Sequence, residues 1–304
     1  MEVLVTGAGG NLGRVVVPAL VEAGHTPKLF DFRPLQTEHQ FVQGDVRSPD
    51  DVQRAVQGVQ AIVHAAALHG IHLRKWQPQD YWDINVTGTF NMYEAARAHG
   101  ISRFVLCSTM GVYGESMKPP EGAWGMVTEQ SPTLPGDVYG MSKLLCEEMG
   151  RYYGRQWGIN TVALRLGMFV PETFERYGFR LLFGGVDDRD VAQAVMLALN
   201  HTPQGGFDCF NIFADVPFSL QDAVQLHEDP LAVLDRYWPG TAQLVRERGL
   251  NVEELIWGRV IWPPDKARRV LGYSPRYNFG QFLEAFRRGD TSYYPFANLP
   301  HWGV

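Results

Sequence analysis

A tyrosine and a lysine stand four residues apart in the segment VYGMSK, residues 138–143. The run around them has a helical pattern, and positions i and i+4 of a helix lie on one face. Tyr139 and Lys143 would then present a phenol and an ammonium group side by side. Because a nearby positive charge favours the phenolate, Lys143 is expected to lower the pKa of Tyr139. Alone, the spacing also suits an ordinary surface pair.

Two adjacent hydroxyl residues, Ser108 and Thr109, end an apolar run at residues 103–109 that predicts a buried strand. The carboxyl edge of a parallel sheet is where such folds bind their ligands. A hydroxyl, a phenol and an ammonium group could therefore converge at one ligand site. Tyr139 would take a proton from a substrate hydroxyl while Thr109 fixes the substrate oxygen, and Ser108 is the alternative for that second role.

The glycines of TGAGGNLG, residues 6–13, directly follow the first predicted strand and open the first predicted helix. Gly7, Gly10 and Gly13 permit a sharp turn, a close approach of the backbone to a pyrophosphate, and tight packing of helix on strand. Free N–H groups at the helix start favour phosphate. Asn11 and Leu12, which begin this helix, are expected to share the contact. The pattern predicts a dinucleotide site.

An acid at the end of the second predicted strand, Asp31, is placed to accept hydrogen bonds from both ribose hydroxyls and to repel a 2′-phosphate. It favours NAD over NADP, although Arg33 and Arg14 are close enough in sequence to hold a phosphate. Asp45, followed by Val46, ends the third predicted strand. Asp45 is expected either to meet the adenine amino group or to serve as a turn or helix cap.

The elements that position these residues alternate between strand and helix through the first half of the chain. Apolar runs at 2–7, 26–32, 61–66, 103–109 and 160–167 predict strands, and helical spacing separates most of them. This alternation predicts an α/β fold with a Rossmann-type, doubly wound parallel sheet. We expect an NAD-binding domain at 1–170 and a smaller C-terminal substrate-binding cap at 171–304. The last strand of the sheet is expected within about 186–215.

The composition excludes several classes of protein. The 304 residues carry 27 basic and 33 acidic side chains, a net charge of −6, which argues against general affinity for nucleic acid. No apolar run is long enough to span a membrane, and the first residues do not resemble a signal peptide. Three scattered cysteines suggest reduced thiols in a cytoplasmic protein. His69 and His72 lack an obvious third ligand, so no metal is expected, and His64 suits a hydrogen-bonded core position.

Taken together, the motifs resemble those of the short-chain dehydrogenase/reductase superfamily in its extended branch, the NAD-dependent epimerase/dehydratase family. The resemblance covers about 275 residues and rests on TGAGGNLG, GDV, HAAA, NVTGT, STMGVYG, YGMSK and LRLGMFVP. It implies that Tyr139 is the general base, Lys143 its partner and a ribose ligand, and Thr109 the donor to the substrate oxygen. For Asn85 it implies a position on a helix beside the active site, and a capping or packing role is the alternative. The further residues expected at the cofactor are Ala65, Ala66, Ala67, Asn85 and Leu166.

Members of this branch act mostly on sugars, often as homodimers. Dehydratases need an acid–base pair after the threonine, and Met110 and Gly111 cannot supply it. The short segment from Pro171 to Arg189 is similar to that of uronate dehydrogenases rather than to that of nucleotide-sugar 4-epimerases. By this resemblance Arg180 would bind a substrate carboxylate. Met110 takes the place of a substrate-contacting Asn of those enzymes, so the substrate pocket is expected to differ there, and His69 is expected to touch the substrate from the loop after the fourth predicted strand. A sugar or sugar-acid dehydrogenase is therefore expected, with a nucleotide-sugar 4-epimerase or a non-catalytic dinucleotide-binding protein as alternatives.

Overall fold

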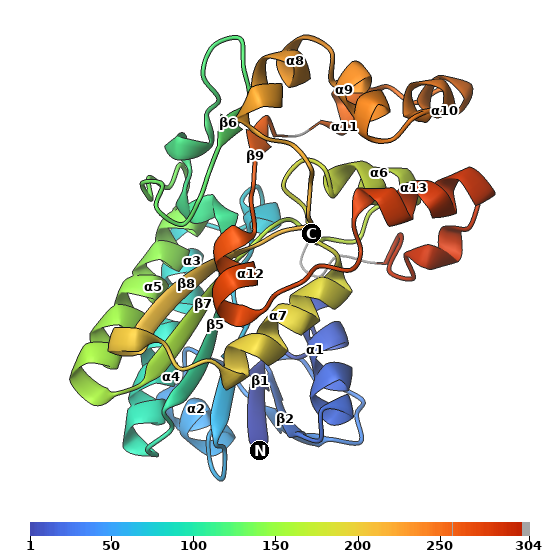
Figure 1. Ribbon diagram of the computed structural model, residues 1–304. Coiled ribbons are helices and arrows are strands. Elements are labelled where there is room, and N and C mark those ends of the chain that lie inside the picture. Colours follow the sequence, from blue (N-terminus) through green and yellow to red (C-terminus); the bar gives the residue numbers. More distant parts are fainter. Residues whose placement is uncertain (257, 300–304) are drawn as a thin grey trace.

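The computed structural model describes residues 1–256 and 258–299, and a parallel sheet of seven strands forms its centre (Figure 1). The strand order is β3-β2-β1-β4-β5-β7-β8, so the chain builds the sheet outward from β1 in two directions. This order confirms the predicted Rossmann-type, doubly wound sheet. The strands are β1 (Glu2–Thr6), β2 (Thr26–Asp31), β3 (Gln40–Gln43), β4 (Ala61–His64), β5 (Arg103–Thr109), β7 (Asn160–Leu166) and β8 (Phe207–Ile212).

Both faces of the sheet are covered by helices, which is why its strands are apolar at nearly every position. In β1, Val3 and Val5 point into the core on one face, while Leu4 points into the core on the other. The first face packs on α1 (Asn11–Glu22), α7 (Asp188–Asn200) and α12 (Asp265–Leu271). The second packs on α2 (Pro49–Ala55), α4 (Gly88–Ala98) and α5 (Val138–Trp157).

A second group of short helices lies beyond the carboxyl ends of the strands (Figure 1). Its core is rich in aromatic rings, among them Phe174, Tyr177, Phe179 and Phe282. A two-stranded sheet of β6 and β9 joins it. The elements are β6 (Gly125–Met126), α6 (Phe174–Arg180), α8 (Ala223–Glu228), α9 (Pro230–Tyr237), α10 (Thr241–Glu247), α11 (Val252–Leu255), β9 (Val260–Ile261) and α13 (Phe279–Arg288).

The helical segment from Pro78 to Ala98 is not a regular α-helix along its whole length. The structure has α3 (Pro78–Tyr81), then a wide π-helical turn, η2 (Trp82–Thr87), and only then α4. Asn85 lies in this turn, and its backbone oxygen accepts a hydrogen bond from the Cys146 thiol of α5 at 3.2 Å. Such π turns often mark functional sites. Here the turn lies against the amino-terminal half of the helix that carries Tyr139.

Within the described part of the chain, no helix is long and apolar enough to cross a membrane. Cys107, Cys146 and Cys209 are buried free thiols.

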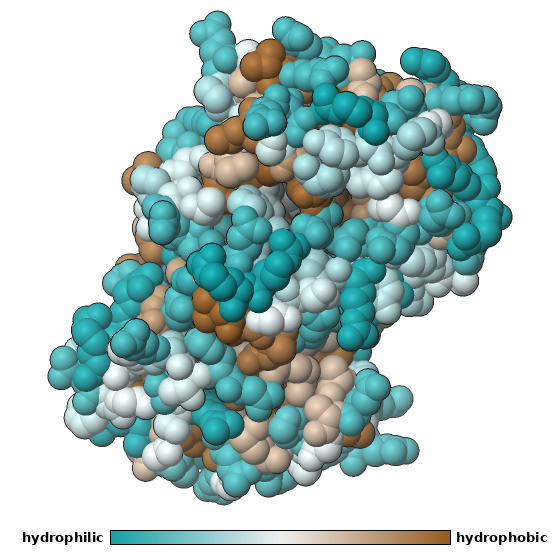
Figure 2. All heavy atoms as spheres, in the orientation of Figure 1, coloured by the Kyte–Doolittle hydropathy of each residue, from teal (hydrophilic) through white to brown (hydrophobic). Residues whose placement is uncertain are grey.

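Polar side chains cover most of the visible face of the molecule, with apolar ones gathered in small patches (Figure 2).

Candidate active site

The glycine loop between β1 and α1 is packed too closely for side chains. Gly7 has a φ of +65°, and a Cβ added to it would lie 2.9 Å from the Ala66 backbone. A Cβ on Gly13 would lie 2.0 Å from the carbonyl oxygen of Ala8. Gly10 caps α1 with backbone alone, so no side chain occupies the helix start. This loop therefore has the open helix terminus and bare backbone that a pyrophosphate requires.

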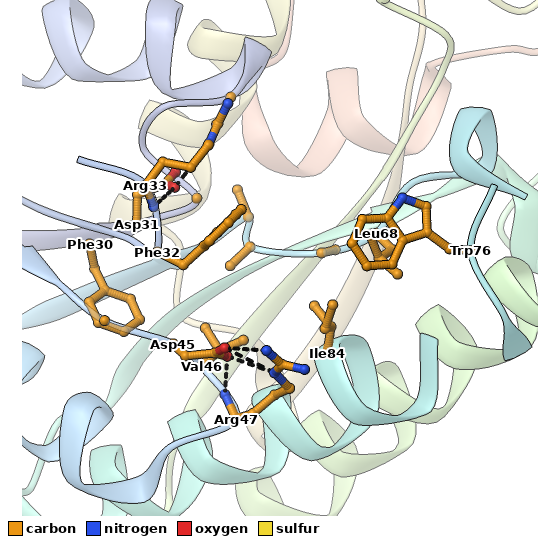
Figure 3. A pocket seen from close by; sticks show the side chains of 16 residues that line it. Phe30, Asp31, Phe32, Arg33, Asp45, Val46, Arg47, Leu68, Trp76 and Ile84 are labelled. Carbon is orange, nitrogen blue, oxygen red and sulfur yellow. Dashed lines mark hydrogen bonds and ion pairs between the residues drawn. The ribbon is translucent and has the colours of Figure 1, made fainter. Parts of the chain in front are cut away.

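A cavity of about 180 Å³ lies beside this loop, over the carboxyl ends of β1, β2 and β4 (Figure 3). Some of the residues that line it were predicted from the sequence, and others were not. The predicted residues on its wall are Gly7, Gly10, Asp31, Arg33, Asp45, Val46, Ala65, Ala66 and Ala67. The residues that sequence reasoning missed include Phe32, Arg47, Trp76 and Ile84. No spacing rule pointed to these four, since they come from loops and from the π turn.

Asp31 is fixed at the end of β2 with its carboxylate in this cavity. Its side chain is 3 % exposed. One carboxylate oxygen accepts from the amide of Gly9 at 2.9 Å, and the other accepts from the amide of Arg33 at 3.0 Å. The Arg33 Nε also lies 3.4 Å from this second oxygen. The acid therefore links the glycine loop to the second strand at the wall of this cavity.

Asp45 is paired with Arg47 at the opposite wall of the same cavity (Figure 3). The Arg47 Nε lies 3.0 Å from each carboxylate oxygen, and the Arg47 amide donates to the carboxylate at 2.9 Å. Partial burial would raise the pKa of Asp45, but these hydrogen bonds and the Arg47 charge outweigh it and lower that pKa. Asp45 thus remains an acceptor at the cavity edge, and it also forms the turn that the alternative interpretation described.

A second cavity, of about 160 Å³, continues from the glycine loop to the ends of β5 and β7. The predicted residues on its wall are Gly7, Gly10, Asn11, Leu12, Ala65, Ala67, His69, Ser108, Thr109, Tyr139, Lys143 and Leu166. The residues that complete the wall and had not been predicted are Ile71, His72, Cys107, Gly167, Phe169 and Val170. The residues predicted for catalysis and those predicted for the cofactor therefore line neighbouring cavities that share the glycine loop.

Tyr139 and Lys143 lie one turn apart at the start of α5, as their spacing predicted. Asp137 caps this helix by accepting from the Gly140 amide at 2.7 Å, which fixes the first turn. Thr109, at the end of β5, lies close enough to the Tyr139 phenol for its hydroxyl to lower the pKa of that phenol. Thr109 Oγ1 also accepts from the Gly111 amide at 3.1 Å, which orients the hydroxyl. The three side chains form a compact group at the cavity wall.

The electrostatics of Tyr139 differ from the expectation. Burial raises the pKa of its phenol, and the hydrogen bond from Thr109 offsets only part of that increase. The predicted lowering by Lys143 is therefore not found, since the pKa of this phenol is raised. The charge of Lys143 instead acts on buried neighbours behind it: after burial itself, it is the second cause that lowers the pKa of His64 to about 3. Desolvation of the phenol thus outweighs the ammonium charge.

His64 is a core residue, as expected. Its ring nitrogens lie 2.8 Å from Thr6 Oγ1 and 3.0 Å from Thr89 Oγ1, and the ring is buried. His69, by contrast, reaches the second cavity, with its ring centroid 5.0 Å from that of Tyr139. Across the described residues, no group of three or more His, Cys, Asp or Glu side chains is arranged to hold a metal ion.

Ser108 does not face the phenol. Its hydroxyl donates to Glu147 Oε1 at 2.6 Å, beneath the cavity. This bond leaves Thr109 as the hydroxyl that acts on the Tyr139 phenol. Sequence reasoning missed Glu147, although an acid one turn beyond Lys143 on the same helix face was a visible signal.

Asn85 acts behind the cavity wall. Its Oδ1 accepts from the Leu68 amide at 2.7 Å, and its Nδ2 donates to the Leu68 carbonyl at 3.0 Å and to Ser142 Oγ at 2.9 Å. These bonds use both amide protons, so a direct contact of this side chain with the cofactor is not supported. Asn85 instead joins the π turn, the loop after β4 and the catalytic helix, which corresponds to the packing alternative.

Two residues predicted for the substrate are placed elsewhere. Arg180 is 1 % exposed and lies in the cap core, where it donates to the Val170 carbonyl and to Glu172 Oε2, the latter at 3.1 Å. Met110 is buried in an apolar cluster with Val112 and Tyr113. Neither belongs to the described lining of the catalytic cavity. Spacing in the sequence could not reveal this, because the direction of each side chain depends on how the cap folds.

The Rossmann-type sheet and the glycine loop define a dinucleotide-binding α/β protein, and comparison with known proteins identifies its family. The model of the NAD dependent epimerase/dehydratase family matches residues 3–176. The chain belongs to this family.

Relatives within the family carry out different reactions. Uronate dehydrogenase of Pseudomonas syringae pv. tomato is 33 % identical over 209 residues, covering 67 % of this chain and 71 % of the relative. UDP-glucose 4-epimerase of Corynebacterium glutamicum is 30 % identical over 303 residues, covering 84 % and 90 %. A short-chain dehydrogenase/reductase superfamily protein from Agrobacterium tumefaciens, solved with bound NAD, superimposes with a TM-score of 0.70 at 25 % identity, covering 96 % and 97 %.

Proposed function

We propose that the protein is an NAD-dependent dehydrogenase that oxidises a hydroxyl group of a sugar-type substrate. The observation that carries this proposal is the meeting of Thr109, Tyr139 and Lys143 on the wall of the cavity that the glycine loop also borders. A positioned hydroxyl and a phenol with an ammonium neighbour are the groups needed to remove a proton from an alcohol. The similarity to uronate dehydrogenase supports the same reaction class.

The chain's own residues would each have one task. Thr109 holds the substrate oxygen, Lys143 stabilises the phenolate form of Tyr139, and this phenolate removes the substrate proton and becomes the neutral phenol. Gly7, Gly10 and the start of α1 hold the dinucleotide phosphates, because bare backbone N–H groups and the helix dipole favour anions there. When bound, NAD supplies the hydride acceptor.

The adenine-ribose end of the site supports a preference for NAD. The carboxylate of Asp31 is directed into the cavity by bonds to the amides of Gly9 and Arg33. A negative charge at this place repels a 2′-phosphate and accepts from ribose hydroxyls. Arg33 lies beside the acid and partly balances its charge, so the preference for NAD is part of the proposal.

A 4-epimerase acting on a nucleotide sugar is the second candidate. The epimerase of Corynebacterium glutamicum aligns along 84 % of this chain, further than the uronate dehydrogenase does. The same base and the same cofactor serve both reactions, so the catalytic group does not separate them. The two differ in whether reduced cofactor is released.

A single assay separates the candidates. The purified protein is mixed with excess NAD and, one at a time, with free aldoses, hexuronates and UDP-sugars, and the NADH absorbance band is followed. Growth of the band with a free sugar or sugar acid is the expected result. Interconversion of a UDP-sugar pair without growth of the band would establish the epimerase instead, and bound NAD without any conversion would indicate a non-catalytic dinucleotide-binding protein.

We also propose that two copies of the chain associate through the outer face of α4 and α5. Trp82, Phe90 and Tyr152 expose large apolar surfaces there, around a groove that also includes Met149. A pair of neighbouring helices can meet its own copy about a two-fold axis. Light scattering is expected to give a dimer for the parent chain and a monomer for Phe90→Glu. A monomeric parent would contradict the proposal.

A further inference from the structure

A fully buried ion pair lies directly beneath the catalytic residues. Glu147 of α5 is 0 % exposed and Arg165 of β7 is 2 % exposed. The Arg165 guanidinium and the Glu147 carboxylate form a bidentate ion pair. Nε of Arg165 lies 3.0 Å from Oε1, and the terminal nitrogen Nη2 lies 2.7 Å from Oε2. Arg165 is the one charged residue in an otherwise apolar stretch of β7. The pair connects the catalytic helix to the sheet.

Hydrogen bonds extend this pair to two neighbouring strands. Ser108 Oγ donates to Glu147 Oε1 at 2.6 Å, and Arg165 donates to the Tyr113 hydroxyl at 2.9 Å. Tyr113 donates in turn to Asn211 Oδ1 of β8 at 2.7 Å. We call these five side chains the buried network. Because Ser108 and Arg165 are register partners on β5 and β7, the network spans three adjacent strands and α5.

Two members of the buried network, Ser108 and Glu147, are close to the catalytic residues in the chain. Ser108 directly precedes Thr109, and Glu147 lies one turn beyond Lys143 on α5. A shift of Glu147 relative to Ser108 would therefore move the phenol of Tyr139 relative to the Thr109 hydroxyl.

Stability alone is a poor reason to bury such a pair. Removing two charges from water is costly, and apolar residues of similar size often stabilise a fold as well or better. We propose that Glu147, Arg165, Ser108 and Tyr113 are positioning residues, which hold the end of β5 against α5 so that Thr109 meets Tyr139 in the catalytic geometry. This inference rests on the proposed role of Tyr139 as the base.

The Thr109 contact is the feature through which the buried network would act. Among the groups that influence Tyr139, Thr109 is the one whose hydrogen bond lowers the pKa of the phenol. If the end of β5 moves away from α5, this bond weakens and the phenol becomes harder to deprotonate. The groups that face or adjoin Tyr139 are Thr109 and Cys107 of β5, Tyr81 of α3, His69 of the loop after β4, and Asp137 and Lys143 at the start of α5.

Two mild variants test the proposal without leaving a buried charge unpaired. Ser108→Ala removes one hydrogen bond to Glu147, and Tyr113→Phe removes the hydroxyl that bridges Arg165 and Asn211. Tyr153→Phe is the matched control. It removes a 2.6 Å bond from Tyr153 of α5 to Glu94 of α4. Tyr153 lies nearly three helical turns beyond Lys143 and is not part of the lining of the second cavity.

Both test variants are expected to lower kcat about tenfold, because small misplacements of catalytic groups are costly, with KM changed less than about twofold. The acid limb of the pH–rate profile is expected to shift to higher pH. Tyr153→Phe is expected to change thermal stability alone. If all three variants lose stability and keep kcat and the pH profile, the network is structural only and the proposal fails. An effect of Ser108→Ala without one of Tyr113→Phe would also overturn it, since only Ser108 reaches the cavity.

A second measurement does not depend on turnover. In the presence of NAD, the tyrosinate absorbance of each variant is titrated with pH against the same chain carrying Tyr139→Phe, so that the difference reports Tyr139. The midpoint is expected to rise in Ser108→Ala and Tyr113→Phe and to stay unchanged in Tyr153→Phe. Unchanged midpoints in the first two would contradict the network's role even if the substrate class proved different. A parent chain that converts no sugar while the midpoints shift would contradict the proposed function alone.

Discussion

At the scale of single residues, the structure separates side chains that face the cavities from those that only neighbour them in sequence. Tyr139, Lys143, Thr109 and Asp31 are predictable from motif and spacing, because each follows directly from the position of a strand end or helix start. Ser108 is equally conspicuous in sequence, yet its hydroxyl points to Glu147 beneath the cavity. The direction of a hydroxyl depends on its tertiary partners, which spacing does not encode.

Asp31 sets the first residue-level prediction. Asp31→Ala removes the charge that disfavours a 2′-phosphate and leaves Arg33 without its 3.4 Å partner. The ratio of kcat/KM for NAD to that for NADP is expected to fall by about tenfold or more, the scale of one lost charged contact. Steady-state kinetics with both cofactors measure this ratio. An unchanged ratio would mean that another residue selects the cofactor.

Arg180 is expected to affect stability, whereas the sequence suggested that it binds a substrate carboxylate. In Arg180→Met, the bonds to Val170 and Glu172 in the cap are lost, and the free energy of unfolding is expected to fall by about 1–3 kcal/mol. The ratio of KM values for an acidic and a neutral sugar should not change, because the guanidinium does not reach the cavity. Thermal melts and kinetics test this, and a selective loss for the acidic sugar would restore Arg180 as a substrate ligand.

At the scale of elements, the start of α5 must approach the loop after β5 very closely. A Cβ on Gly140 would lie 2.4 Å from the Gly111 carbonyl oxygen, whereas a Cβ on Gly136 would meet only the end of the Glu115 side chain at 3.8 Å. Gly140→Ala is therefore expected to separate Tyr139 from Thr109 and lower kcat by about a hundredfold. Gly136→Ala, four residues away, is the control and should be nearly neutral. Equal activities in the two variants would refute the importance of this contact.

The elements also show where sequence reasoning ends. The strands of the sheet and the helices α1 and α5 follow from apolar periodicity, because burial on two faces or one face leaves a regular pattern. The π turn at Trp82–Thr87 cannot be predicted from apolar periodicity. Its residues suit an ordinary helix, and the wide turn arises where Asn85 binds the Leu68 backbone and Ser142. Likewise, Trp76 and Arg47 reach the adenine side of the site from irregular segments, which periodicity cannot position.

At the scale of the whole molecule, an acid at the start of α7 is buried between the sheet and the cap. Burial raises the pKa of Asp188 to about 6, and the charge of Arg180 offsets only part of this effect. The Tyr294 hydroxyl donates to it at 3.1 Å. The folded state therefore binds this proton more tightly than the unfolded state does, so the ionised acid costs stability above about pH 6 and costs none below about pH 4.

Asp188→Asn is expected to remove this cost. The free energy of unfolding should rise by about 1–3 kcal/mol at pH 7.5, and the gain should shrink as the pH falls from 6 to 4. Denaturant titrations of parent and variant across this range measure the difference. A gain that is independent of pH would show that ionisation of Asp188 is not the cause.

We propose that Tyr139 removes the proton from a sugar hydroxyl as NAD is reduced. This role is tested by the NADH absorbance formed by the parent and by Tyr139→Phe with the same free sugar or sugar acid, alongside the NAD dissociation constant of each. We expect NADH from the parent, a loss in kcat of about a thousandfold or more in the variant, and NAD binding within about threefold of the parent. Near-normal NADH formation by Tyr139→Phe, or none by the parent with any free sugar, would contradict it.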